Sequence, residues 1–101
     1  MKRKPAKLGD VLASVLERAG LTDRLAQARV IPEWPVLVGS QIAEVTEPVS
    51  LQRDGTLVVA VRTNGWMTEL SLMEPELLRV LNADTSRPPI VRLRLVLARQ
   101  A

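Results

Sequence analysis

The spacing of apolar residues switches between a helical and a strand period three times along this chain, which restricts the fold more than any other feature. Before Pro48, apolar positions recur every three or four residues, as on one face of an α-helix. Strand patterns follow up to Arg62, helical spacing returns over 66–81, and strict alternation covers 90–97. Because such elements pack as layers, the chain is predicted to be an α+β domain of three strands packed by helices.

The N-terminal residues divide into a charged stretch and an amphipathic helix. Residues 1–7 are charged and contain Pro5, so we expect a flexible basic arm followed by one domain over 8–101. Gly20 is placed to end the first helix in the left-handed conformation. The apolar face of this helix consists of Leu8, Val11, Leu12, Val15, Leu16 and Ala19.

A second helical region is predicted between Thr22, a good N-cap, and about Ala43. Pro32 lacks an amide donor and should bend the region or divide it in two. Pro35 is then tolerable in the first turn of the restarted helix. The predicted buried side consists of Leu25, Ala28, Ile31, Trp34, Val38, Ile42 and Val45.

The second half of the chain completes the order α-α-β-β-α(α)-β. Asp54-Gly55 predicts a hairpin turn between strands near 49–53 and 57–62. Thr63 or Asn64 can cap the following helical region, in which Pro75 predicts a kink or a two-helix corner. In the last strand, Arg92 and Arg94 alternate with apolar residues and form a basic face. The helical stripe consists of Trp66, Leu70, Met73, Leu77 and Leu81.

The composition argues against catalysis. The sequence has no histidine and no cysteine, which removes the commonest general base, thiol nucleophiles and the usual metal ligands. It contains no glycine-rich phosphate loop, and its carboxylates flank the apolar stripes as surface residues do. We therefore expect neither an enzyme nor a cofactor. No apolar run is long enough for a signal peptide or a membrane span, which predicts a cytoplasmic protein.

Positive charge is concentrated at the two ends of the chain, although the net charge is only +3. Such clusters can neutralise the phosphates of a nucleic acid. The alternative is that they are solubilising charges on a tail and on an exposed strand face. The candidate nucleic-acid-binding residues are Lys2, Arg3, Lys4, Lys7, Arg92, Arg94 and Arg99; Arg87 belongs to the same C-terminal cluster.

The only aromatic residues, Trp34 and Trp66, lie on the apolar stripes of their helices. This placement favours packing over base stacking, which usually uses aromatics on a sheet face. Gly39 interrupts the second helical region. It either packs closely against another backbone or serves as a helix C-cap.

Taken in order, several short segments resemble the DciA family over roughly residues 8–97. These segments are Trp34-Pro-Val-Leu-Val-Gly39, Pro48, Asp54-Gly55-Thr-Leu-Val-Val-Ala-Val, Trp66 with Glu69-Leu70, Pro75-Glu-Leu-Leu and Leu81-Asn82. Trp34, Gly39, Gly55, Trp66 and Leu70 correspond to structural positions of the family. The resemblance implies a fold like a type II K-homology (KH) domain, which agrees with the predicted order.

The resemblance also implies a non-enzymatic replication accessory protein, which binds the replicative DNA helicase and assists its loading onto single-stranded DNA. Many family members carry a basic extension beyond this domain. The GXXG loop with which KH domains grip nucleic acid is absent, since no two glycines lie three residues apart. DNA contact would then be weak and salt-dependent and would use the basic side chains. The alternatives are a KH-like RNA-binding module, for example on the ribosome, and a pure protein-interaction domain.

Overall fold

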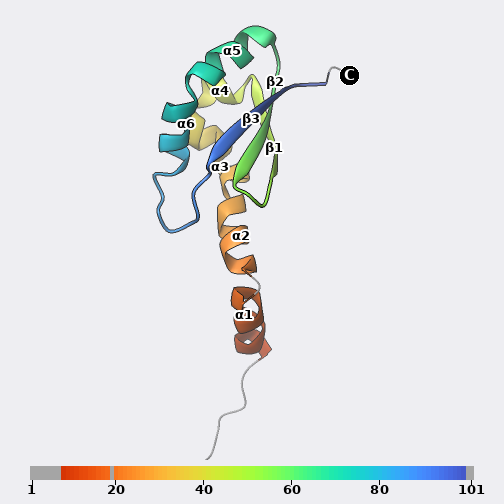
Figure 1. Ribbon diagram of the computed structural model, residues 1–101, viewed down its shortest axis with the longest axis vertical. Coiled ribbons are helices and arrows are strands. Elements are labelled where there is room, and N and C mark those ends of the chain that lie inside the picture. Colours follow the sequence, from red (N-terminus) through yellow and green to blue (C-terminus); the bar gives the residue numbers. More distant parts are fainter. Residues whose placement is uncertain (1–7, 19, 100–101) are drawn as a thin grey trace, which may run out of the picture.

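A computed structural model of the chain describes residues 8–18 and 20–99. Helices α3–α6 cover one face of a three-stranded sheet, and α2 and α1 project in line from one end of this body (Figure 1). The α+β class and the predicted order of helices and strands are confirmed. The elements are α1 (Leu8–Arg18), α2 (Leu21–Ala28), α3 (Val30–Val38), α4 (Ser40–Ala43), β1 (Thr46–Leu51), β2 (Thr56–Val61), α5 (Asn64–Leu72), α6 (Glu74–Leu81) and β3 (Arg92–Leu97).

The sheet is mixed, with β2 in the centre. β1 pairs with β2 antiparallel, and β3 pairs with β2 parallel, so that Leu57 lies beside Leu93. The predicted hairpin turn is confirmed: Gly55 has a φ of 90°, which glycine adopts without strain. The Asp54 carboxylate accepts a hydrogen bond of 3.0 Å from the Thr56 backbone amide, which fixes this turn.

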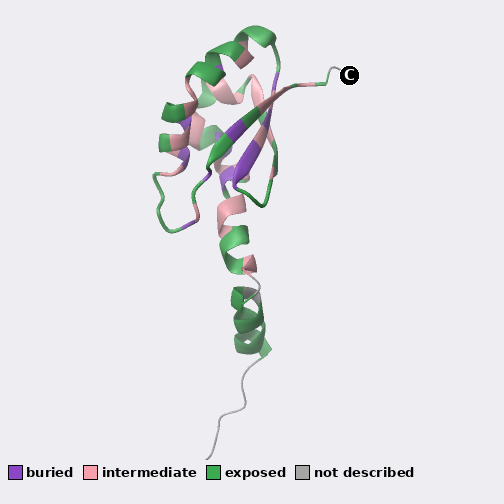
Figure 2. Ribbon diagram, in the orientation of Figure 1, coloured by how far each residue is buried: buried purple, intermediate pink, exposed green. Residues whose placement is uncertain are grey.

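The core lies between the sheet and helices α3, α5 and α6, as the purple segments of Figure 2 show. Leu57, Val59 and Val61 of β2 are fully buried, which explains why the central strand is apolar. Trp34 is also buried, and its indole Nε1 donates a hydrogen bond of 2.8 Å to the Thr46 hydroxyl. The core therefore joins α3 to the first strand through a packed and satisfied indole.

The second helical region differs from its prediction, because it is divided into three helices. α2 begins after Gly20, so that Thr22 lies inside the helix and is not its N-cap. The breaks occur at Arg29 and Gly39, whereas Pro32 lies in the first turn of α3, where its missing amide costs no helical bond. Pro35 lies inside α3 and is not in the first turn of a restarted helix.

Gly39 ends α3 and precedes α4 with a φ of 89°. A Cβ atom placed on it would meet nothing within 4 Å. The C-cap interpretation is confirmed, and close packing against another backbone is wrong. The conformation, rather than crowding, therefore accounts for glycine at this position.

The helical region after the hairpin forms the predicted two-helix corner. The Thr63 hydroxyl accepts a hydrogen bond of 3.1 Å from the Trp66 amide and caps α5. The corner lies at Met73, and Pro75 occupies the first turn of α6, where proline is tolerated. Leu70, Leu77 and Leu81 of the predicted stripe are buried in the core.

The predicted helix at the N-terminus is confirmed as far as Arg18, but its apolar face is uncovered. Leu8 is 83% exposed, and Val11, Leu12 and Val15 are each about half exposed. Ala19 and the side chain of Leu16 lie outside the described residues, as do the predicted basic arm over 1–7 and the chain end at 100–101. Leu25 of α2, predicted to be buried, is 63% exposed. In Figure 2, the residues of α1 whose burial is described are green.

Candidate binding surfaces

The face of the sheet opposite the helices carries the predicted basic residues of the last strand. Arg92 and Arg94 are exposed and pair in register with Thr56 and Val58 of β2. Leu93, between them, is buried on the helical side, so the alternation of the sequence directs both guanidinium groups to the open face. Two residues span about 6.6 Å along a strand, so that the arginines form a short row of positive charge.

One carboxylate lies close to this row. The pKa of Asp54 is held below its ordinary value, chiefly by the hydrogen bond from the Thr56 amide, then by the Thr56 hydroxyl, and to a smaller extent by the positive charge of Arg92. Asp54 is therefore ionised at neutral pH and offsets part of the charge of Arg92. Arg94 lies farther along the strand and contributes the less compensated charge of the pair.

Of the remaining predicted nucleic-acid-binding residues, the structure describes Arg99, which does not join this row. Arg99 is exposed two residues beyond the end of β3, about seven residues and roughly 23 Å from Arg92 in an extended chain. Lys2, Arg3, Lys4 and Lys7 lie outside the described residues. Among the three candidates that the structure describes, it brings together Arg92 and Arg94 and leaves Arg99 apart.

Arg87 has a different role from the other arginines of the C-terminal cluster. Its side chain is only 5% exposed, and it donates a hydrogen bond of 2.9 Å to the Glu33 carboxylate. This ion pair joins the segment before β3 to α3, far apart in the sequence. The guanidinium is therefore a structural group and is not available to a nucleic acid.

Two further polar side chains hold the last strand in place, and the sequence analysis assigned them no role. Asn82 donates a hydrogen bond of 2.8 Å to the Ile90 carbonyl and accepts one of 2.8 Å from the Ile90 amide. Glu74 accepts a hydrogen bond of 2.8 Å from the Leu93 amide of the edge strand β3. Both side chains satisfy backbone groups that β2 does not reach. Only the Leu81-Asn82 segment of the family pattern marked one of these positions.

The described surfaces carry no metal-binding cluster and no aromatic ring on the open sheet face. Among residues 8–18 and 20–99, no group of three or more His, Cys, Asp or Glu side chains is arranged to hold a metal ion. Trp66 is half-buried on α5, beside Thr63 and Glu69, and Trp34 is in the core, so neither ring lies on the open sheet face. The row of arginines can neutralise phosphates but has no stacking platform beside it. In the described residues, every helix is too short or too polar to cross a membrane.

Comparison with known proteins gives one family. The sequence profile of the family described as "Dna[CI] antecedent, DciA" matches residues 7–95. A UPF0232 protein of Mycobacterium tuberculosis is 31% identical over 93 residues, which are 92% of this chain and 49% of that protein. A UPF0232 protein of Mycolicibacterium smegmatis is 31% identical over 94 residues, which are 93% of this chain and 48% of that protein. The chain spans about half the length of the curated relatives it matches.

Proposed function

Because this chain belongs to the DciA family, we propose that it is a DNA-replication accessory protein that binds the replicative helicase and assists its loading onto single-stranded DNA. The observation that carries this function is the family match over residues 7–95, which includes almost every described element. The fold supports it, because its described surfaces offer charged and apolar binding groups rather than a catalytic pocket. We expect no ATP hydrolysis by the chain itself.

A loading assay tests the function. The replicative helicase of the same organism is mixed with a forked substrate whose single strand is coated with single-stranded-DNA-binding protein, and unwinding is followed with and without the chain. We expect faster unwinding with the chain and no ATP hydrolysis by the chain alone. Unwinding rates that do not depend on the chain would contradict the proposed function.

For DNA contact, we propose Arg92 and Arg94 on the open sheet face, together with Arg99 and the N-terminal basic residues. Exposed guanidinium groups bind phosphates mainly by releasing counterions, with a slope of about −0.7 in log affinity per log salt for each phosphate of a single strand. Two arginines and a basic arm therefore give weak binding with a strong salt dependence.

Titration of a fluorescent single strand at several salt concentrations tests this assignment. We expect R92E/R94E to weaken binding and to flatten the salt slope, whereas R79E, which reverses an exposed arginine already paired with Glu76, should change both much less. DNA binding by R92E/R94E at wild-type strength would show that Arg92 and Arg94 do not contact DNA. Stronger binding to RNA of the same sequence would favour the RNA-binding alternative.

A further inference from the structure

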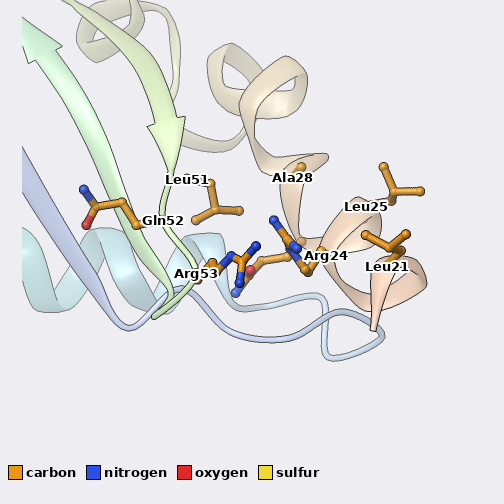
Figure 3. A pocket seen from close by; sticks show the side chains of 8 residues that line it. Leu21, Arg24, Leu25, Ala28, Leu51, Gln52 and Arg53 are labelled. Carbon is orange, nitrogen blue, oxygen red and sulfur yellow. The ribbon is translucent and has the colours of Figure 1, made fainter. Parts of the chain in front are cut away.

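A cleft of about 230 Å³ lies between α2 and the residues at the end of β1 and just after it (Figure 3). Its walls are mostly apolar and include Leu21, Leu25 and Ala28 of α2 and Leu51 of β1. This volume is below the range of about 300–1,000 Å³ typical of small-molecule pockets. The cleft therefore suits one or two side chains of another protein better than a free ligand.

Two arginines flank the apolar walls. Arg24 extends from α2 and Arg53 from the turn after β1, and the two side chains point toward each other across the cleft (Figure 3). Neither forms an ion pair with any residue that the structure describes, whereas Arg29, Arg79 and Arg87 each have a carboxylate partner. Two like charges at one cleft repel each other, and a carboxylate between them would relieve this repulsion with bidentate hydrogen bonds.

Two exposed contacts connect α2 to the rest of the domain. The Gln27 amide donates a hydrogen bond of 2.9 Å to the Pro89 carbonyl, and Arg29 at the end of α2 pairs with Glu33 at the start of α3. These contacts connect α2, one wall of the cleft, to the segment before β3 and to α3.

Further exposed apolar side chains lie at the rim of the cleft and on α1. Leu25 is 63% exposed at its rim, and α1, which contacts α2, presents Leu8, Val11, Leu12 and Val15 to solvent. Exposed apolar side chains near arginines without an ion-pair partner are typical of a protein-binding surface. A nucleic-acid backbone would satisfy the guanidinium groups but would leave these aliphatic side chains in water.

We propose that this cleft receives an acidic segment of the replicative helicase, an assignment that rests on the proposed function. An aliphatic or aromatic side chain of that segment enters between Leu25 and Leu51, and neighbouring Asp or Glu carboxylates pair with Arg24 and Arg53. The helicase and the DNA then bind different surfaces, the α2 cleft and the open sheet face.

Two double variants with the same change of net charge test this separation. Binding of the full chain to the helicase is measured without nucleic acid, and binding to a fluorescent single strand is measured in parallel. We expect R24E/R53E to weaken helicase binding at least about tenfold and to change DNA affinity less than about twofold. R92E/R94E should show the opposite pattern. Circular dichroism checks that both variants fold.

Milder substitutions separate the hydrogen-bond geometry of the two arginines from their charge. R24K/R53K keeps both charges but loses the bidentate geometry, so its helicase affinity should lie between those of the wild type and R24Q/R53Q. Leu25→Ser removes an exposed apolar group and should weaken helicase binding several-fold without unfolding the chain. If R24E/R53E does not fold, the helicase and DNA affinities of R24Q/R53Q and Leu25→Ser test the assignment of the cleft instead.

The other outcomes each have a defined meaning. Wild-type helicase binding by R24E/R53E overturns the cleft and leaves the proposed function standing. Loss of DNA binding alone by R24E/R53E makes the cleft a phosphate site and also overturns the assignment. Equal losses from both double variants would show dependence on net charge rather than on the cleft. If the unaltered chain does not bind the helicase, the partner itself is wrong.

Discussion

Helices α1 and α6 carry the same kind of apolar stripe, and the structure uses the two stripes differently. In α6, Leu77 and Leu81 are 4% and 1% exposed and pack against the sheet and α3. In α1, the four described apolar residues of the stripe are 46% to 83% exposed. The period of 3.6 thus determines that both segments are amphipathic helices, but it does not determine what covers the apolar face. A face without a cover inside the domain is available to a partner.

The largest expected effect comes from shortening a buried leucine of α6. Leu81→Ala should lower the free energy of unfolding by about 2–5 kcal/mol, because it removes packed methyl groups and leaves a cavity in the core. Urea denaturation followed by tryptophan fluorescence measures this change, since Trp34 is buried in the same core. A loss below about 1 kcal/mol would mean that the core around α6 is loosely packed.

Asn82, just after α6, is hydrogen-bonded to Ile90, and removing its side chain is expected to have the next largest effect on the free energy of unfolding. Asn82→Ala should cost about 1–3 kcal/mol, because the amide and carbonyl of Ile90 both lose a partly buried partner. Asn64→Ala is the matched control, since the Asn64 side chain is exposed at the start of α5. Similar costs for the two substitutions would show that the paired hydrogen bonds to Ile90 contribute little.

The sequence alone predicts the α+β class, the hairpin and the strand faces, because these follow from local period and turn chemistry. Strict alternation places Arg92 and Arg94 opposite the core, and Asp54-Gly55 fits one kind of turn. The buried ion pair of Arg87 with Glu33 could not be predicted, because its two residues are 54 positions apart. Arg87 and Arg92 belong to the same basic stretch of the sequence. Only the tertiary fold shows that Arg87 is buried in an ion pair and that Arg92 is exposed.

The helix boundary at Arg29 could not be predicted for a similar reason, whereas a helix end at Gly39 was one of the two interpretations of that glycine. Both prolines of α3 are usual helix breakers, yet the chain bends before and after the helix that contains them. The burial of Trp34 and its hydrogen bond to Thr46 fix α3 against β1 in that position. Tertiary packing thus keeps Pro35 inside α3 against the local preference of proline, whereas Pro32 lies in the first turn, where proline is tolerated.

A smaller effect on the free energy of unfolding is expected from a substitution in α2 at its contact with the segment before β3. Gln27→Ala removes the hydrogen bond to the Pro89 carbonyl, and because this contact is exposed the cost should be about 0.5–1 kcal/mol. Hydrogen exchange of the α2 amides should become faster while that of β2 stays unchanged. Equal acceleration in both elements would indicate that α2 unfolds only together with the core.

The smallest expected effect on the free energy of unfolding comes from a substitution in α1. Leu12→Ala should change the free energy of unfolding by less than about 0.5 kcal/mol, because the side chain is already 54% exposed and alanine favours a helix. Urea denaturation at several protein concentrations checks this value and detects self-association. A cost comparable to that of Leu81→Ala would contradict the contrast between the two helices.

Hydrogen–deuterium exchange of the chain with and without the replicative helicase tests the central claim most directly. Our account predicts slower exchange over α1, α2 and the end of β1 when the helicase binds, with β3 unchanged. Adding a single strand in place of the helicase should instead protect the β3 side of the sheet. Helicase-induced protection confined to β3 and α6, or no protection anywhere, would contradict the account.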